Sequence, residues 1–384
     1  MSRKKLKICH ITSMHDWQDD RIFQRACAGL ARLGHEVHLV AVCEEDQKPG
    51  KFESLKVTVH LLPHRSGRKR RWNGSKDVIK AAVHLQAEVY EFHDPDLLPH
   101  IGLLKKKVPG SAVIYDIHEN YAGRFANWGL PAFLGDIFRS YEKKVINGLD
   151  GITVVSESMS SLFKGVRTPV EITRNSTDIE RLRGIELPEP DADSAPVIVT
   201  SGSHSHARNC LQTVKALPYL VQDLTVNPVM QFVGRYLDNM DQEMEEQAKA
   251  DGTSDYLKID GMMPWEENFK RIAKAYCGCV FYEDNPNNRV GIPNRLFEYM
   301  YCGIPVVVSD FPELKKVVTQ AQCGVVVNSE DPRDIARGLE ELLSDPEKAR
   351  EMGRKGRQAM EGTYGYHVDL EILENFYYKL LKRS

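Results

Sequence analysis

The sequence predicts an α/β protein built from two doubly wound domains. Three observations lead to this prediction: strand and helix signals alternate along the chain, many strands are near-continuous apolar runs, and one polar, proline-rich segment interrupts the alternation. Apolar strands between helices are typical of parallel sheets that helices cover on both faces. A chain of 384 residues is also longer than one ordinary core requires.

The first half alternates strands with helices. Apolar side chains at helical spacing predict a first helix over residues 21–34, which Gly34 ends. Further helices are expected over residues 77–87 and 96–107 and in a long stretch ending near Gly148. Strands are expected over residues 7–12, 36–42, 56–62, 89–94, 112–118 and 151–156.

The segment RGIELPEPDADSAP contains three prolines, four acidic residues and few apolar side chains. This composition predicts a linker over residues 184–196, between domains spanning residues 1–183 and 197–364. Beyond the linker, strands are expected over residues 197–202, 229–234, 256–261, 277–283, 304–310 and 323–329, again separated by helices. A final amphipathic helix, within residues 365–384, is expected to pack back on the first domain.

The two halves carry opposite charge. Residues 1–185 contain 29 Lys and Arg against 22 Asp and Glu, a net of +7, and the remainder contains 22 against 32, a net of −10. Part of the positive charge lies in PHRSGRKRRWNG, a basic segment that includes Arg68, Lys69, Arg70 and Arg71. A solvated surface loop explains such a run, but an anionic membrane would also attract it. No apolar stretch is long enough for a spanning helix or a signal peptide core.

Several enzyme classes lose their main sequence support. The chain has no GxGxxG motif opening the first helix, no GxxxxGK[ST], no HExxH and no GxSxG. Its eight cysteines are scattered, which favours buried reduced thiols over disulfides or a metal centre. The run HDPD, residues 93–96, is open to two interpretations: a DxD metal site, or a polar strand end where Asp94 or Asp96 caps the next helix.

The stretch NRLFEYMYCGIPVVVSD places one glutamate on a mostly apolar helix. At helical spacing Leu296, Phe297 and Met300 share one side, whereas Glu298 lies on the opposite side. Gly303 fits the position that ends the helix. Glu298 is either an exposed residue favoured by the helix dipole or a ligand for hydroxyl groups, such as those of a ribose.

PNRLFEYMYCGIPVVVSD resembles the donor-site motif of retaining GT-B glycosyltransferases of family 4, the group 1 family. The resemblance extends over essentially the whole chain, through ICHITSMHDWQDDRIFQRACAGLARLGHEVHLV, HDPDLLP, VIYDIHENY and RNSTDIERL. It implies the GT-B fold, in which two Rossmann-like domains face a central cleft that binds the substrates. It also implies transfer of a sugar from a nucleoside-diphosphate sugar.

The resemblance assigns roles to particular residues. Glu298 takes the place of the glutamate that binds the donor ribose, and His118 that of a strand-end histidine that approaches the transferred sugar. Gly202 and Ser203 match the start of the second-domain phosphate pattern, although Ser203 replaces the usual arginine. Arg208 matches its diphosphate-binding cation.

Two further residues of the donor helix complete the expected donor site. Arg295 could supply the charge that Ser203 lacks. Many relatives have a second glutamate, which holds the donor sugar, where this chain has Val290; contacts from Asn294 or backbone amides would then replace it.

Together these features predict a cytoplasmic glycosyltransferase that acts with retention on a UDP- or GDP-sugar. The acceptor is expected to be a saccharide or a lipid-linked saccharide of bacterial surface polysaccharide synthesis, received on the side of Arg21 and the basic segment. No cofactor, metal ion or nucleic acid is expected. The protein is expected to dock on the inner membrane face. Two alternatives stay open: a sugar-nucleotide epimerase of the same fold, and a non-catalytic scaffold that binds sugar nucleotides or polysaccharide.

Overall fold

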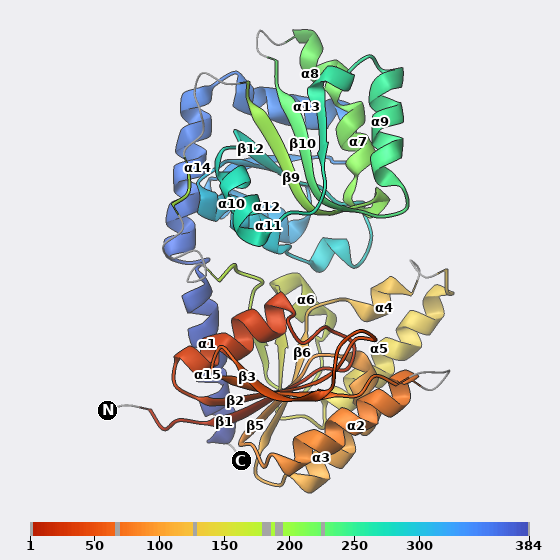
Figure 1. Ribbon diagram of the computed structural model, residues 1–384, viewed down its shortest axis with the longest axis vertical. Helices are drawn as coiled ribbons and strands as arrows, with labels where there is room; N and C mark the ends of the chain where they lie inside the picture. Colours follow the sequence, from red (N-terminus) through yellow and green to blue (C-terminus); the bar gives the residue numbers. More distant parts are fainter. Residues whose placement is uncertain are drawn as a thin grey trace. The chain divides into compact units, whose positions relative to one another are not determined.

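A computed structural model describes residues 3–65, 70–125, 129–178, 186–188, 195–223 and 227–382 (Figure 1). The chain forms two compact units: unit 1 comprises Met1–Arg174 and His367–Ser384, and unit 2 comprises Asn175–Tyr366. The first boundary between the two units therefore lies between Arg174 and Asn175, whereas the sequence predicts it after residue 183. Most of the predicted linker, residues 184–196, lies outside the described residues.

Unit 1 is built around an eight-stranded sheet with the order β3-β4-β2-β1-β5-β6-β7-β8. All neighbouring strands are parallel except β3 and β4. The central strands β1, β5, β6 and β7 are almost entirely buried, which explains their apolar sequences. The strands are β1 (Lys7–Ile11), β2 (Glu36–Val42), β3 (Gly50–Ser54), β4 (Val57–Leu62), β5 (Val89–Phe92), β6 (Ala112–Ile117), β7 (Gly151–Val154) and β8 (Val170–Ile172).

The helices of unit 1 include the C-terminal helix α15 (Tyr366–Leu381). The ends of Phe376 and Leu380 approach Gly151 so closely that a Cβ there would lie 2.7 Å from each of them, so α15 packs directly on β7. The other helices are η1 (Asp20–Cys27), α1 (Ala28–Arg32), α2 (Arg70–His84), η2 (Pro95–His100), α3 (Ile101–Lys107), α4 (Tyr121–Arg124), α5 (Ala132–Ile146) and α6 (Glu157–Leu162).

Unit 1 differs from the sequence prediction in several features, one of which is the unexpected short strand β8. The hairpin β3–β4 turns at Leu55 and Lys56, both with positive φ, where turns of this kind usually have Asn-Gly. The long helix expected before Gly148 is divided into α4 and α5. Helix α2 begins at Arg70, so the basic segment is helical from there rather than a loop throughout.

Unit 2 contains a fully parallel six-stranded sheet with the order β11-β10-β9-β12-β13-β14. Its strands are β9 (Val197–His204), β10 (Val229–Tyr236), β11 (Leu257–Asp260), β12 (Cys277–Val280), β13 (Val306–Ser309) and β14 (Gly324–Val327). Its helices are η5 (His206–Arg208), α7 (Cys210–Lys215), α8 (Leu217–Asp223), α9 (Met240–Ala250), η6 (Ser254–Tyr256), α10 (Trp265–Ala273), η7 (Asn288–Val290), α11 (Asn294–Cys302), α12 (Pro312–Ala321), α13 (Pro332–Leu343) and α14 (Pro346–Glu361).

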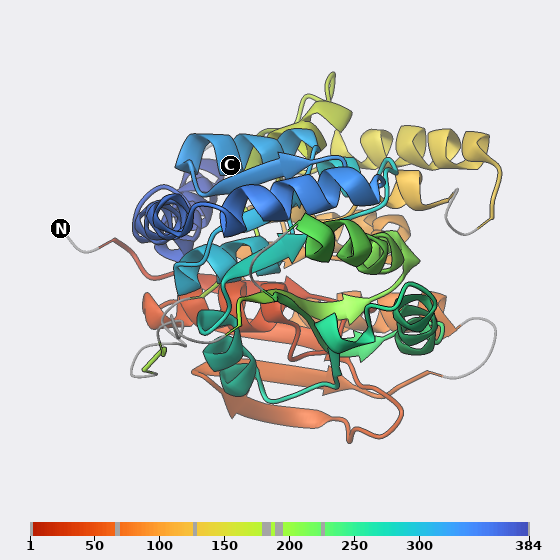
Figure 2. The same cartoon turned by 90° about the horizontal axis from the view of Figure 1, so that it is seen from above.

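Helices cover both faces of this second sheet (Figures 1 and 2). Adjacent strand residues point to opposite faces, so Ile198 joins the core beneath α7, α9 and α13, whereas Val199 joins the core beneath α10, α11 and α12. The helix predicted from NRLFEYMYC is confirmed as α11. Its apolar stripe is buried, Glu298 is half-buried, and Gly303 ends the helix with φ 75°.

Candidate functional site

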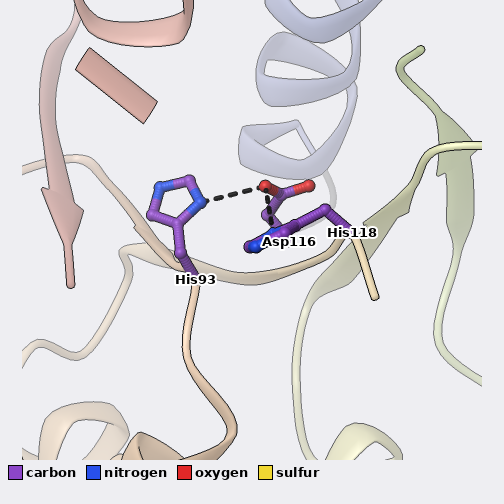
Figure 3. Close-up of side chains that lie close together, drawn as sticks. All are labelled: His93, Asp116 and His118. Carbon is purple, nitrogen blue, oxygen red and sulfur yellow. Dashed lines mark hydrogen bonds and ion pairs between the residues drawn. The ribbon is translucent and has the colours of Figure 1, made fainter. Parts of the chain in front are cut away.

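In unit 1, the ends of two neighbouring strands bring buried polar side chains together (Figure 3). His93 directly follows β5, Asp116 lies near the end of β6, and His118 follows β6. These strands are parallel neighbours, so their carboxyl ends lie at the same edge of the sheet. His93 and Asp116 are almost fully buried, whereas His118 retains 11% side-chain exposure.

The Asp116 carboxylate is the centre of this group. The Arg21 guanidinium donates to both of its oxygens, at 2.8 Å from Nε and 2.6 Å from Nη2. His93 Nδ1 lies 2.9 Å from Oδ2, and Thr153 Oγ1 lies 2.9 Å from Oδ1. Burial by itself would raise the pKa of Asp116, but the Arg21 charge and these hydrogen bonds hold it well below its usual range.

His93, Asp116 and His118 are close enough together to hold a metal ion. Both Asp116 oxygens, however, already accept hydrogen bonds from Arg21, and a divalent cation would have to bind next to that guanidinium. The donor set therefore fits a hydrogen-bonded ion-pair cluster, and we assign no metal ligands here.

His118 lies between two charged groups. Its Nδ1 is 3.5 Å from Asp116 Oδ2, and its Nε2 is 3.3 Å from His15 Nε2. The Asp94 carboxylate binds His15 Nδ1 at 2.6 Å. Burial opposes a charge on His15, but Asp94 outweighs it and raises the His15 pKa to about 9. The predicted residue His118 is thus next to an imidazolium that the sequence analysis did not identify.

The HDPD segment needs a correction. Asp94 precedes η2, but its side chain makes no capping bond. It accepts hydrogen bonds from Thr12 Oγ1 at 2.7 Å and from the backbone N–H groups of Ser13 and Met14 at 2.6 and 3.0 Å. Asp94 therefore fixes the loop after β1 and, through it, His15. The sequence indicated that HDPD is a polar strand end. It offered no signal that Asp94 would bind the loop of residues 12–15, about 80 residues earlier.

The structure describes the side chain of only one of the five residues that the sequence assigned to the acceptor side. Arg21 keeps 13% side-chain exposure in its ion pair with Asp116 and also donates to the Thr173 carbonyl at 3.2 Å, so its guanidinium is held inside unit 1. Arg68 and Lys69 lie outside the described residues. Arg70 and Arg71 lie in the first turn of α2, and their side chains are outside the description.

In unit 2, Gly202 and Ser203 lie near the carboxyl end of β9, ahead of η5 and Arg208. Gly202 has φ 108°, and a Cβ there would lie 3.3 Å from Arg208 Nη1, so glycine lets the guanidinium approach the backbone. Arg208 is half-buried, 5.6 Å from the ring centre of Tyr282. Within the described residues no carboxylate pairs with it.

Arg295, which the sequence suggested as a substitute for the charge that Ser203 lacks, is only 5% exposed. Its Nη2 donates to the Phe281 carbonyl at 3.0 Å, and its Nη1 lies 3.3 Å from Thr200 Oγ1. Its guanidinium carbon lies 4.9 Å from the centre of the Tyr282 ring, and no acidic partner occurs among the described residues. Arg295 therefore adds positive potential from within the unit.

The remaining residues predicted for the donor site, Asn294 and Glu298, lie along one side of α11. Asn294 and Glu298 are one helical turn apart, and both are half-buried. Proline at the N-terminal cap provides no side-chain hydrogen bond to the first turn. Val290 is buried at the end of η7, so it cannot offer a polar contact to a sugar.

Two family models account for most of the chain. The model described as "Glycosyltransferase Family 4" matches residues 20–181, and "Glycosyl transferases group 1" matches residues 187–359. The chain is a family 4 glycosyltransferase. The predicted site residues Arg21, His118, Gly202, Ser203, Arg208, Asn294, Arg295 and Glu298 fall within these two matches, whereas His15 lies ahead of them.

This glycosyltransferase is similar to several curated proteins. It is 24% identical over 289 residues to the GDP-mannose-dependent monoacylated alpha-(1-6)-phosphatidylinositol monomannoside mannosyltransferase of Corynebacterium glutamicum, covering 70% of this chain and 71% of that protein. It is 20% identical to spore coat protein SA of Bacillus subtilis, with 94% of each chain covered. Its 27% identity to the capsular polysaccharide glycosyltransferase CapM of Staphylococcus aureus spans only 26% of each.

Solved structures confirm the GT-B fold of this glycosyltransferase. Sucrose-phosphate synthase of Thermosynechococcus elongatus matches with a TM-score of 0.79 at 16% identity, covering 99% of this chain and 100% of that one. HepE of Anabaena, solved with UDP, matches with a TM-score of 0.72 at 12% identity, covering 96% and 99%.

Proposed function

We propose that this glycosyltransferase moves a hexose-type sugar from a UDP- or GDP-sugar to a saccharide or lipid-linked acceptor, with retention at the anomeric carbon. The observation that carries the proposal is Arg208, a half-buried cation beside the exposed backbone of Gly202, with no acidic partner among the described residues. An unpaired guanidinium at the carboxyl end of a parallel sheet suits a diphosphate.

The surroundings of Arg208 support the same ligand. Arg295 lies beneath Tyr282 and adds a second unbalanced positive charge. The N-terminus of α11 provides amide groups that favour an anion. Glu298, one turn further along, would accept hydrogen bonds from the ribose hydroxyls. These groups compensate the diphosphate charge, so we expect no divalent metal requirement.

During transfer, the bond between the anomeric carbon and the diphosphate oxygen breaks, and the acceptor oxygen bonds to that carbon from the same face. The acceptor proton passes to the departing diphosphate. Negative charge on the phosphates grows as their bond to the sugar breaks, so Arg208 stabilises the transition state more than the ground state. His118 would orient a hydroxyl of the transferred sugar.

A donor screen tests this function. Saturating UDP-, GDP- and ADP-sugars would each be tested for thermal stabilisation, where a ligand at 100 times its dissociation constant adds about 2.7 kcal/mol. The stabilising donor would then be incubated with saccharide acceptors, and the anomeric configuration of the product read by NMR. Stabilisation by none of these donors would contradict the proposal. A new sugar epimer formed from donor alone would indicate an epimerase.

A role in bacterial surface polysaccharide synthesis is supported by the partial similarity to CapM. We further propose that unit 1 docks reversibly on an anionic membrane face through the basic segment. Trp72, at the start of α2, is 52% exposed, as an interfacial anchor would be. No helix among the described residues is both long and apolar enough to span a bilayer.

A further inference from the structure

A second carboxyl group is buried beside the Asp116 cluster. Glu91 lies on β5 and is 2% exposed, and Thr153 on β7 is fully buried between Glu91 and Asp116. Thr153 Oγ1 is 3.1 Å from Glu91 Oε1 and 2.9 Å from Asp116 Oδ1. On the other side, the Tyr377 hydroxyl of α15 donates to Glu91 Oε2. These side chains link the C-terminal helix to Asp116.

The hydrogen atoms in this chain of contacts can be counted. A threonine hydroxyl has one proton, so it can donate to only one of the two carboxyl groups. Asp116 is the better acceptor, because it is the carboxylate held by Arg21. If the 3.1 Å contact with Glu91 is also a hydrogen bond, Thr153 Oγ1 accepts there, and Glu91 can donate only as a carboxylic acid. The direction of donation is therefore Tyr377 to Glu91 to Thr153 to Asp116.

The balance of buried charge leads to the same assignment. Among the described residues, Arg21 is the permanent cation that pairs with the cluster, and its charge is balanced by Asp116. A second carboxylate at Glu91 would be a buried charge without a counterion, which is strongly unfavourable. Burial and the Asp116 charge raise the pKa of Glu91. The titratable or charged groups around Glu91 are His10, Arg21, Cys27, His93, Asp116 and Tyr377.

The two histidines of the cluster are consistent with a neutral Glu91. His10 Nδ1 and His93 Nε2 lie 3.1 Å apart, and burial and the neighbouring His93 lower the pKa of His10 well below its usual value. If His10 donates to His93 and His93 donates to Asp116, both rings are neutral. The competing arrangement has an ionised Glu91 and a cationic His93, and it would leave a His10 N–H buried without a partner at Nε2.

We propose that Glu91 is a positioning residue: as a neutral carboxylic acid it joins Tyr377 of α15 to Asp116, and so fixes the carboxylate that orients Arg21, His93 and His118. The effect of Glu91 on catalysis rests on the proposed function, because Glu91 would act through His118. The protonation state of Glu91 does not depend on that function, since it is a property of the free protein.

Substitutions at Glu91 test its positioning role in catalysis separately from its protonation state. Glutamine reproduces the neutral acid, since its N–H can donate to Thr153 and its carbonyl can accept from Tyr377. Leucine keeps a similar volume and removes both hydrogen bonds. We expect E91Q to keep kcat within about threefold of wild type, and E91L and Y377F to lose about tenfold or more with donor KM little changed. Y276F removes a hydroxyl bonded to the Leu342 carbonyl in unit 2 and should leave kcat unchanged.

Infrared difference spectroscopy of the free protein at neutral pH tests the protonation directly. The wild-type minus E91Q spectrum should contain the carbonyl band of a protonated carboxyl group, and the wild-type minus Y377F spectrum should show that band shifted. A carboxylate band in the first spectrum would overturn the assignment, whether or not any transferase activity has been found. Equal kcat for E91Q and E91L, with both folded, would overturn the positioning role. E91Q and Y377F preserve the test if E91L fails to fold.

Discussion

Replacing Asp116 by asparagine should strongly destabilise the protein. The substitution removes the charge that balances Arg21, whose side chain is 13% exposed and binds both carboxylate oxygens within 2.8 Å. Breaking one partner of a buried pair leaves an uncompensated charge and costs about 3–5 kcal/mol. That loss is a large share of a typical total of about 5–15 kcal/mol.

The effect should depend on pH in a defined direction. The folded pKa of Asp116 is depressed, so its contribution to stability is fully present above the unfolded value of about 3.9 and is lost as the pH falls toward the folded value. The difference between wild type and D116N should therefore be constant from about pH 5 to 8 and should shrink below about pH 4.

Urea unfolding at several pH values measures both effects. The matched control is D310N, which breaks the ion pair of Asp310 with Lys315, where both side chains are more than half exposed. Such a surface pair contributes about 0.2–1 kcal/mol. A loss for D116N no larger than that of D310N, or an unchanged difference at low pH, would show that Asp116 does not carry the buried charge assigned to it.

The remaining predictions concern function. E298Q should weaken donor binding by about 1–3 kcal/mol in calorimetry, the loss expected for charge-assisted hydrogen bonds, and unchanged affinity would remove Glu298 from the site. R208A should lower kcat more than it raises donor KM. Wild-type activity should persist in EDTA; an activity that EDTA abolishes and Mn²⁺ restores would contradict the metal-free proposal. H118A should lower kcat about 100-fold or more with the fold intact, and near-normal turnover would exclude a catalytic role. Vesicle co-sedimentation should require anionic lipid and decrease with salt, and glutamate at positions 68–71 should abolish it; equal binding to neutral vesicles would refute electrostatic docking.

Local signals in the sequence determined most of the periodic elements and the two doubly wound α/β domains, and the family resemblance implied the GT-B fold. The run NRLFEYMYC specified α11 because helical spacing separates its buried stripe from Glu298, and glycine at 303 tolerates the positive φ that ends the helix. The apolar runs specified strands buried on both faces. The hairpin at Leu55 and Lys56 could not be predicted, because its turn lacks the usual residues.

Only the tertiary structure decided which charges face each other. Arg21 meets Asp116 across 95 residues, and Tyr377 meets Glu91 across 286. A sequence shows that such groups exist, but their protonation and exposure depend on partners that folding brings within hydrogen-bonding distance. For the same reason the sequence could not show that Arg295, suggested as a substitute for the charge that Ser203 lacks, is buried beneath Tyr282. Side-chain spacing is encoded locally, whereas electrostatic balance is set by the packed strands and helices together.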